Sequence, residues 1–514
     1  MEHQTMGFRA LLLSIFLGAV LCDREEWSGW GANVQNNRWA ADNRAVSSCS
    51  IRSLTSHCQV PYRSGVSATP VIAGDTVYYP TWGGLFVALD YTTCRTRWSI
   101  NVTDIIAGSP GGITPLQAQV TNPVSRTSPQ IDGDVLYFGT LTKALLVAVD
   151  RRDGTLLDTM PVNAHELAVI TGSPTFYDGR IFIGSSSSEG AAGRVPGYQC
   201  CSFIGNMMAA TFEKSQNKFS VDWDLPMLPT AGNWSGVAVW GSQPSIDIAR
   251  NQLFFGTGNL YSNPLEYDKC NNNQTADCYP PSVLQESVLA VDASSGRLNW
   301  VNRIPPGADV DFGMMPTFIP SHVSGQPRDI VIVGQKSGLL YSMDATTGTI
   351  QWATTTSPTG PAAGLSWGVA ADSSRAYFTA INSGRTTWQL RPSGETVSNS
   401  AYGAADLATG ELLWETPAPR GSIAFGPPTV VGDVVLVART GLIGPDAPDP
   451  DYDKTRGGLV VLRKRSGEVV GDFELDANFH GGVAVQGEYV MFGTGYSNYI
   501  GTGSFHVMKV SRHR

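Results

Sequence analysis

The chain has 514 residues, of which 35 are Lys or Arg and 44 are Asp or Glu, so its formal net charge is −9. This acidic balance disfavours nucleic acid and anionic membrane surfaces as partners. Charged residues make up only 15% of the sequence, and Gly occupies 56 positions. Long amphipathic helical patterns are absent from the sequence, so the composition favours strands and turns over a helical bundle.

The N-terminus carries the pattern of a secretory signal. Arg9 precedes the apolar run ALLLSIFLGAVL, and the sequence becomes charged at DREEW. Because this run is too short to cross a bilayer, residues 1–22 are predicted to be a cleaved signal peptide, and no other stretch is predicted to span a membrane. Asn101, Asn233 and Asn273 each begin an N-glycosylation sequon. We therefore expect a protein that is secreted or held in the lumen of the secretory pathway.

A repeated motif organises the rest of the chain. Each copy has a hydrophobic strand, a polar residue, a turn residue four positions later and, in the clearest copies, a Trp four positions after that. Gly is frequent at the turn position because it adopts positive φ without steric cost. The Trp residues are expected to pack between neighbouring copies. The polar residues of seven copies are Asp90, Asp150, Thr211, Asp292, Asp344, Asp406 and Arg463.

A second motif, a Gly/Asp turn followed by a β-rich run, occurs eight times from GDTVYY to GEYVMFGTG. Eight copies predict an all-β fold, an eight-bladed β-propeller of four-stranded blades that forms a single domain over residues 23–514. The last copy stops shortly after FHVMKV, so its outermost strand is expected to come from the N-terminal part of the chain. We expect WSGWGANVQNNRWA, residues 27–40, to supply this strand and to close the ring.

Cysteine spacing predicts disulfide bonds, which an oxidising compartment would allow. Cys270 and Cys278 flank a polar loop and are predicted to close it. Cys49 and Cys58 have a similar spacing and are predicted to pair in the same way, which leaves Cys94 unpaired.

Cys200 and Cys201 are adjacent in the sequence CCSFIGN. A bond between neighbouring cysteines closes a strained eight-membered ring, which persists only if its surroundings hold it. One interpretation is a rigid disulfide plate that faces a ligand. The alternative is two unrelated small apolar residues, and we favour the disulfide.

The Trp-bearing repeat, the run CCSFIGN, the run GTGNLYSNP and the run GQKSGLLYSMD together resemble the quinoprotein alcohol dehydrogenase propellers, particularly the polyvinyl alcohol dehydrogenase branch. The resemblance extends from Trp27 to Val510. Members of that family hold pyrroloquinoline quinone (PQQ) at the propeller axis above a calcium ion. A vicinal disulfide lies on one face of the quinone and a Trp on the other. The resemblance implies the same propeller and a redox site on its axis.

The resemblance also implies roles for particular residues. Glu189 and Asn259 resemble the family's calcium ligands, with Asp311 beside them, and carboxylate and amide oxygens suit Ca²⁺. Capping of turns by Glu189 and Asn259 remains an alternative. Asp311, with Asp309 next to it, resembles the aspartate that takes the proton of the alcohol.

Three further residues complete the implied site. Lys336, in GQKSG, would bind the oxygens of the quinone, and Trp240 or Trp367 would stack on its ring. The sequence departs from the family in having a shorter segment before DVDFG. It also contains no Cys-x-x-Cys-His, so no covalent haem is expected and a dehydrogenase would need a separate electron acceptor.

The function favoured by the sequence alone is a cofactor-independent hetero-Diels-Alderase. Secreted fungal propellers of similar appearance join a tropolone-derived o-quinone methide to a humulene-type sesquiterpene, and the assignment is by analogy. The stretches GNMMAA, FGMMP and GVAVWG suit a pocket for small apolar substrates, where proximity supplies most of the acceleration. In this interpretation no cofactor is needed, and Lys336, Asp309 and Asp311 act on the tropolone oxygens.

Two alternatives stay open. One is a PQQ- and calcium-dependent alcohol dehydrogenase, in which Asp311 is the base. The other is a non-catalytic secreted scaffold, which would leave the polar residues near the axis unexplained. In either enzyme, the substrate pocket is expected to be lined by Trp240, Trp367, Asn259, Cys200 and Cys201.

Overall fold

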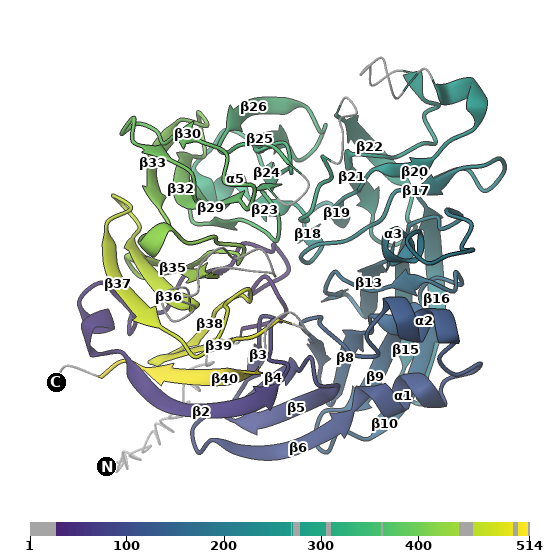
Figure 1. The fold of residues 1–514 in the computed structure, drawn as a ribbon, viewed down its shortest axis with the longest axis horizontal. Helices are drawn as coiled ribbons and strands as arrows, with labels where there is room; N and C mark the ends of the chain where they lie inside the picture. The colour runs from purple at the N-terminus through teal and green to yellow at the C-terminus, as the bar shows by residue number, and fades with distance from the viewer. Residues whose placement is uncertain are drawn as a thin grey trace, which may run out of the picture.

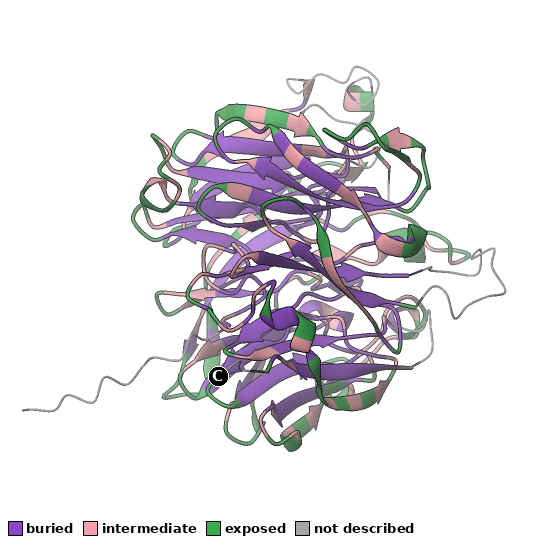
Figure 2. Ribbon diagram, turned by 90° about the vertical axis from the view of Figure 1, so that its left-hand side faces the viewer, coloured by how far each residue is buried: buried purple, intermediate pink, exposed green. Residues whose placement is uncertain are grey.

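The computed structural model describes residues 27–268, 270, 278–304, 310–360, 363–441, 456–496 and 502–511. Over these residues the strands form eight antiparallel sheets, each built on four strands and arranged as blades around a central axis (Figure 1). The inner strands of the blades are buried, whereas outermost strands such as β6 and β26 are largely exposed (Figure 2). The predicted all-β, eight-bladed propeller is therefore confirmed. The predicted signal peptide at 1–22 lies outside the described residues.

The first four blades follow one another along the chain, and each runs from its innermost strand outward. Their strands are β3 (Val71–Ala73), β4 (Thr76–Pro80), β5 (Leu85–Asp90) and β6 (Arg95–Asn101); β7 (Gln130–Asp132), β8 (Val135–Gly139), β9 (Leu145–Asp150) and β10 (Leu156–Pro161); β12 (Thr175–Tyr177), β13 (Arg180–Gly184), β15 (Asn206–Glu213) and β16 (Lys218–Pro226); β18 (Ser245–Asp247), β19 (Gln252–Gly256), β21 (Ser287–Asp292) and β22 (Leu298–Arg303).

The last four blades complete the ring, and in the eighth the outermost strand is β2, from the N-terminal part of the chain. Their strands are β23 (Thr317–Ile319), β24 (Ile330–Gly334), β25 (Leu339–Asp344) and β26 (Ile350–Thr355); β28 (Ala370–Ala371), β29 (Arg375–Asn382), β32 (Ala401–Asp406) and β33 (Leu412–Pro417); β34 (Thr429–Val431), β35 (Val434–Arg439), β36 (Gly458–Arg463) and β37 (Val469–Glu474); β38 (Ala484–Gln486), β39 (Tyr489–Gly493), β40 (Thr502–Lys509) and β2 (Thr55–Arg63).

Short elements decorate the blades, and no helix in the described part of the chain is long and apolar enough to cross a membrane. The helices are η1 (Ser50–Ser53), α1 (Val102–Gly108), α2 (Pro115–Val120), η2 (Thr142–Ala144), α3 (Glu189–Ala192), η3 (Leu265–Tyr267), α5 (Ser321–Ser324) and η5 (Pro419–Gly421). The remaining strands are β1 (Trp39–Ala40), β11 (Ala168–Val169), β14 (Ser186–Ser187), β17 (Ser235–Gly236), β20 (Leu260–Ser262), β27 (Ala363–Gly364), β30 (Trp388–Gln389) and β31 (Thr396–Val397).

The Trp and Gly of the repeat join each blade to the next. The indole N–H of Trp98 in blade 1 donates to the carbonyl of Arg151 in blade 2 at 2.9 Å. The same ring packs on Gly154, where a Cβ would lie 2.8 Å from it and φ is +80°. Gly at this position therefore allows both the turn and the close approach of the Trp. The predicted packing role of the repeat Trp is confirmed, and equivalent pairs are Trp223 with Gly296, Trp300 with Gly348, Trp352 with Gly410 and Trp414 with Gly467.

The ring is closed by an N-terminal strand, as predicted, but by a later one than expected. Strand β2 pairs antiparallel with β40 along its length, from Thr55 with Lys509 to Arg63 with Thr502. The expected closing segment, residues 27–40, lies elsewhere. This pairing supplies the fourth strand of the eighth blade and joins the N-terminal part of the chain to its C-terminal strand.

A disulfide bond reinforces the closure. Cys58 on β2 is bonded to Cys94, in the turn between β5 and β6 of blade 1. The predicted Cys49–Cys58 bond is therefore wrong, and Cys49 is a free, exposed cysteine. The prediction failed because it paired neighbours in sequence, whereas ring closure brings β2 beside the first blade. Cys200–Cys201 and Cys270–Cys278 are bonded as predicted.

Residues 27–40, here called the axial segment, cross the middle of the ring (Figure 1). Its backbone carbonyls accept hydrogen bonds from the innermost strands of successive blades: Val34 from Ile246, Gln35 from Phe318, Asn37 from Ala371 and Arg38 from Val430. Strand β1 then pairs in parallel with β34. The innermost strands, which have no further strand of their own blade beside them, thus find backbone partners in this segment.

One buried carboxyl in blade 6 predicts a pH-dependent stability. Glu415 on β33 accepts a hydrogen bond from the amide of Arg391 at 2.6 Å, and its other oxygen has no hydrogen-bond partner among the residues that the structure describes. Burial raises the pKa of Glu415 from 4.5 to about 7. The folded state therefore binds more protons than the unfolded state between these values, and stability falls as the pH rises through that window.

Glu415→Gln is expected to remove this loss. The shift corresponds to about 3 kcal/mol, so the variant should be more stable than the wild type by up to this amount above pH 7 and should gain nothing below pH 4.5. Urea unfolding at the two pH values measures the difference, with the exposed Glu411→Gln as control. Equal stability of wild type and Glu415→Gln at the higher pH would contradict the prediction.

Candidate active site

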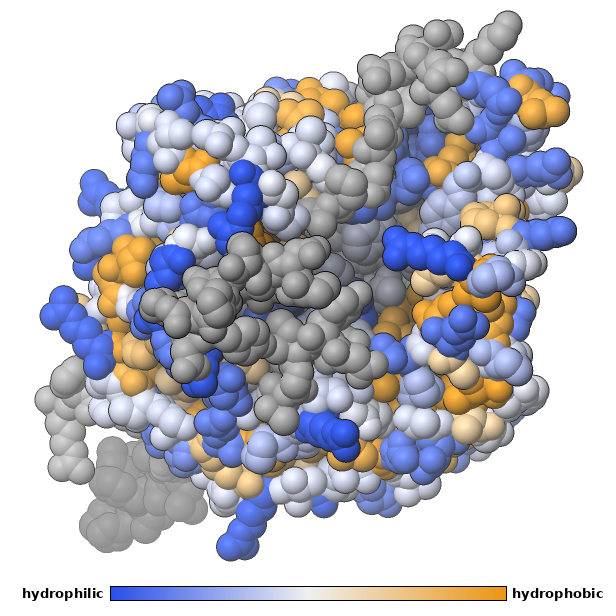
Figure 3. Space-filling model, viewed as in Figure 1, coloured by the Kyte–Doolittle hydropathy of each residue, from blue (hydrophilic) through white to orange (hydrophobic). Residues whose placement is uncertain are grey.

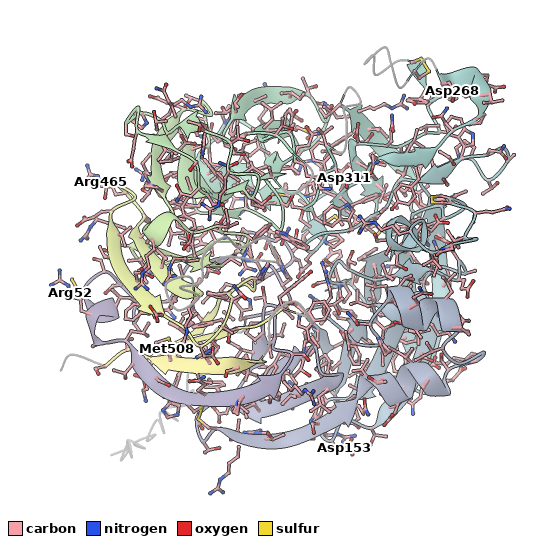
Figure 4. All side chains as sticks on the ribbon, in the orientation of Figure 1. Arg52, Asp153, Asp268, Asp311, Arg465 and Met508 are labelled. Atoms are coloured by element: carbon pink, nitrogen blue, oxygen red, sulfur yellow. A yellow bond between two sulfur atoms is a disulfide. The ribbon has the colours of Figure 1, made fainter. Side chains whose placement is uncertain are left out.

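The topology gathers the predicted site residues on one face of the propeller. Turns between the first and second strands of a blade lie on one face, whereas links between the second and third strands and between blades lie on the other. Asn259 and Lys336 lie in links between the second and third strands of their blades. Trp240, Asp311 and Trp367 lie in links between blades, so all five residues lie on the same face. We call this the site face. Asp311 lies nearer the middle of the ring than labelled peripheral residues such as Asp153 (Figure 4).

Asp311 and Lys336 form the centre of the arrangement. The ammonium Nζ of Lys336 donates to Oδ2 of Asp311 at 3.0 Å, and the amide of Asn259 donates to Oδ1 at 2.7 Å. The backbone amide of Lys336 also donates to the carbonyl of Asp311 at 3.1 Å. Both side chains are buried. A buried carboxylate and ammonium that are paired in this way are held in defined positions.

Trp240 covers this ion pair. Nζ of Lys336 lies 5.1 Å from the centroid of the Trp240 ring, within the range of a cation–π contact. Trp367 meets Trp240 edge-to-face, with 5.8 Å between the ring centroids. Two glycines allow the close packing: a Cβ on Gly313 would lie 3.0 Å from the Trp240 ring, and a Cβ on Gly258 would lie 3.0 Å from Oδ1 of Asp311.

Glu189, at the start of α3, is fully buried and holds a loop. Its carboxylate accepts hydrogen bonds from the hydroxyl of Tyr198 at 2.7 Å, the amide of Ser202 at 2.9 Å and the amide of Phe203 at 3.0 Å. These donors flank the Cys200–Cys201 bond, so Glu189 positions the loop that presents the disulfide. The capping role that the sequence left open for Glu189 is thus present in the structure.

Backbone hydrogen bonds connect this loop to Asp311. The carbonyl of Phe203 accepts from the amide of Gly236 at 2.6 Å, and the carbonyl of Asn259 accepts from the amide of Val237 at 2.8 Å. The amide of Asn259 in turn donates to Asp311. Strand β17 therefore lies between the loop of Glu189 and the Asp311–Lys336 pair, and the predicted residues form a continuous band across three blades.

Comparison with known proteins gives this band a context. A family model described as the β-propeller domain of glucose, ethanol and alcohol dehydrogenases, named for PQQ, matches residues 50–364. The chain belongs to this family. A second model, of the outer membrane protein assembly factor BamB, matches residues 284–447.

Curated relatives of this PQQ-family propeller are alcohol-oxidising enzymes. The polyvinylalcohol dehydrogenase of Sphingopyxis sp. is 25% identical over 427 residues, which cover 76% of this chain and 58% of the relative. The quinone alcohol dehydrogenase subunit of Gluconobacter oxydans is 24% identical over 345 residues, which cover 63% of this chain and 44% of the relative. The chain thus spans about half the length of these relatives.

A solved structure shows the same fold. The quinohemoprotein alcohol dehydrogenase of Comamonas testosteroni superposes with a TM-score of 0.69 at 16% sequence identity, over 95% of this chain and 81% of that one. The likeness supports the predicted resemblance to quinoprotein propellers. Family membership also overturns the prediction that the site works without a cofactor, because the matched family is one of quinone-linked dehydrogenases.

The residues of this PQQ-family propeller fit a quinone. Lys336 offers an ammonium for quinone oxygens, Trp240 offers a flat ring that packs closely on Gly313, and Glu189 holds the loop that carries the Cys200–Cys201 bond. The fit to calcium is limited to the oxygen atoms of Glu189 and Asn259. Among the residues described, no three His, Cys, Asp or Glu side chains form a group that could hold a metal ion.

Four residues of the site face were missed from the sequence. The guanidinium of Arg126 lies 5.0 Å over the Trp367 ring and donates to the hydroxyl of Tyr496 at 3.0 Å. Tyr496 stacks on His480, with ring centroids 4.5 Å apart, and a cavity of about 50 Å³ lies among these side chains and Trp30. Burial, with the nearby charge of Arg126, lowers the pKa of His480 to about 3, so this imidazole is neutral. Arg126 stands in a link between blades, the class of segment that also carries Trp240, Asp311 and Trp367.

Two of the remaining predicted residues lie outside the described part of the chain, and two lie within it. Asp309 lies outside the described residues, so only Asp311 of the two predicted aspartates is placed. Asn273 also lies outside them. The side chain of Asn101 caps α1 by accepting from the amide of Thr103 at 3.0 Å, and Asn233 is exposed.

Proposed function

We propose that the chain oxidises an alcohol at the site face with PQQ as the bound electron acceptor. The observation that carries the proposal is the buried Asp311–Lys336 pair beneath Trp240, on a propeller of the PQQ family. Lys336, Trp240 and the Cys200–Cys201 plate would hold the quinone, and Glu189 and Asn259 would supply oxygens to an accompanying calcium ion. When bound, the quinone supplies a two-electron acceptor for the hydride of the carbinol carbon.

The residues of the chain supply the proton chemistry. The Asp311 carboxylate accepts the hydroxyl proton of the alcohol, because a base fixed within reach of the reacting group lowers the barrier to proton transfer. Lys336 and the Asn259 amide hold both oxygens of this carboxylate in place. Trp240 shields the pair from water, which strengthens its electrostatic interactions.

A second cavity on the site face suits a small, largely apolar alcohol. Its volume is about 220 Å³, and it is lined by Trp82, Val120, Leu141, Val169 and Tyr496 together with the polar Thr121, Asn122 and Ser188. It shares no residue with the Asp311–Lys336 pair. Hydrophobic residues gather near α2 on the face seen in Figure 3. An apolar wall of this kind binds an alkyl or aromatic body through the hydrophobic effect.

Other predicted functions have less support. The hetero-Diels-Alderase function stays a prediction, and the relatives reported above are dehydrogenases by name. A non-catalytic scaffold does not account for the buried Asp311–Lys336 pair. Since the sequence has no Cys-x-x-Cys-His, we propose that electrons pass to a separate acceptor, and that the protein works in the secretory pathway or outside the cell.

Reconstitution tests the proposal. The purified chain is incubated with PQQ and Ca²⁺, freed of unbound quinone by gel filtration, and assayed for dye reduction with butan-1-ol and benzyl alcohol. We expect retained quinone and alcohol-dependent dye reduction that a chelator abolishes and Ca²⁺ restores. If the chain retains no quinone and shows no alcohol-dependent dye reduction, the proposal is overturned. Incubation without alcohol is the control.

A further inference from the structure

A large hollow lies on the face opposite the site face. Its volume is about 510 Å³, within the range of sites for drug-sized molecules. Its outer walls are the turns between the first and second strands of three blades, at Asp247–Ala249, Ile319–Val323 and Ala371–Asp372. Because such turns and the links of the site face lie on opposite sides of the ring, this hollow is separate from the candidate active site.

The axial segment forms the inner wall of the hollow. Asn33, Gln35, Asn37 and Trp39 all line it. The segment is held by backbone hydrogen bonds to Ile246, Phe318 and Ala371, at 2.8, 3.0 and 2.9 Å. The wall is therefore built into the fold and does not depend on a loop at the surface.

Apolar side chains dominate the rim and the sides. Ile248, at the rim, is 52% exposed, and Val323 is also exposed. Phe318, Ile319 and Trp39 continue the apolar surface inward. Exposed apolar groups around a concave surface gain free energy when a ligand removes them from water.

The polar groups of the inner wall are available to a ligand. The Asn33 amide donates to Oδ1 of Asn37 at 2.9 Å, which leaves the Nδ2 group of Asn37 as a donor. Neither this group nor the side-chain amide of Gln35 has a hydrogen-bond partner in the described part of the chain. Both amides are uncharged, and Gln35 offers a donor and an acceptor.

The charges around the hollow are already paired. Arg250 forms ion pairs with Asp247 and with Asp329, the latter at 2.6 Å. Lys464 pairs with Asp372 at 3.1 Å. A charged ligand would compete with these pairs, whereas a neutral ligand leaves them intact. The imidazole of His322 also lines the hollow.

We propose that this hollow is a second small-molecule site, which binds a neutral molecule with a flat apolar body and a hydrogen-bonding group. The apolar body lies against Trp39, Ile248 and Ile319, and the polar group meets the amides of Gln35 and Asn37. The proposal does not depend on alcohol oxidation, because the lining shares no residue with the Asp311–Lys336 pair.

A fluorescent probe tests the site in the full chain. Prodan, 6-propionyl-2-(dimethylamino)naphthalene, is neutral and flat and carries a carbonyl acceptor. Titration is expected to give a saturable blue shift of its emission with one dye bound per chain. Ile248→Asp is expected to raise the Kd by about tenfold or more, because it places a charge on the apolar rim.

Two further variants sharpen the result. Gln35→Leu keeps the backbone contacts of the axial segment and should weaken binding by about fivefold through loss of a hydrogen bond. Val221→Asp is the matched control, because Val221 is 49% exposed on β16, at the outer edge of blade 3, and its Kd should equal that of the wild type. Non-saturable binding, or a wild-type Kd in Ile248→Asp, would overturn the proposal.

Discussion

Replacing Asp311 with Asn is expected to lower kcat for alcohol oxidation by about 10³-fold, the contribution typical of a general base. The amide keeps the shape of the side chain and its position beside Lys336 and Asn259, but it has no lone pair basic enough to take the hydroxyl proton. Quinone retention should change little, because the predicted quinone contacts come from Lys336, Trp240 and the Cys200–Cys201 plate. Steady-state rates and the bound quinone are measured on the same preparation.

The chain offers a closely matched control for Asp311. Asp344, in blade 5, is also 6% exposed and forms an ion pair with Arg328 at 3.0 Å, the same distance as between Asp311 and Lys336. Asp344→Asn should therefore cost a similar amount of stability and leave kcat unchanged. If both variants lose activity equally, the loss reflects the fold. If Asp311→Asn keeps the wild-type kcat, Asp311 is not the base.

The blades were predictable because their determinants are local. The Trp98–Gly154 contact joins two blades, yet each partner is marked by its position in its own copy of the repeat. Counting the copies was enough to predict the number of blades. The Cys58–Cys94 bond and the place of the axial segment were not predictable in this way, since they depend on which residues meet once the ring has closed.

The candidate site shows the same division. Asn259, Asp311 and Lys336 were predicted from motifs that resemble those of a known family, and the structure brings them together. Arg126 and Tyr496 stand 370 positions apart and belong to no shared motif, so their contact was missed. The role of Glu189 could not be predicted from its residue type alone. A carboxylate suits calcium, but in the structure its hydrogen bonds hold the neighbouring loop.

Arg38 anchors the axial segment to the blades around it. Its guanidinium is fully buried, stacks over Trp30 at 4.3 Å, and donates to the carbonyls of Pro428, Trp30 and Val483. It also donates to the hydroxyls of Thr69 and Thr429. Burial lowers its pKa to about 9, so the side chain is still a cation at neutral pH. One side chain thus joins the axial segment to blades 1, 7 and 8.

Arg38→Met is expected to destabilise the protein by about 4 kcal/mol, since it leaves several buried acceptors without donors. Arg38→Lys keeps the charge but has fewer donors in a less suitable geometry, so it should fall between Arg38→Met and the wild type. Urea unfolding measures the three proteins. Arg152→Met is the control, because the Arg152 side chain is 70% exposed and its ion pair with Asp150 lies at the surface, where such pairs contribute little. If Arg38→Met is as stable as Arg152→Met, the axial segment does not hold the ring together.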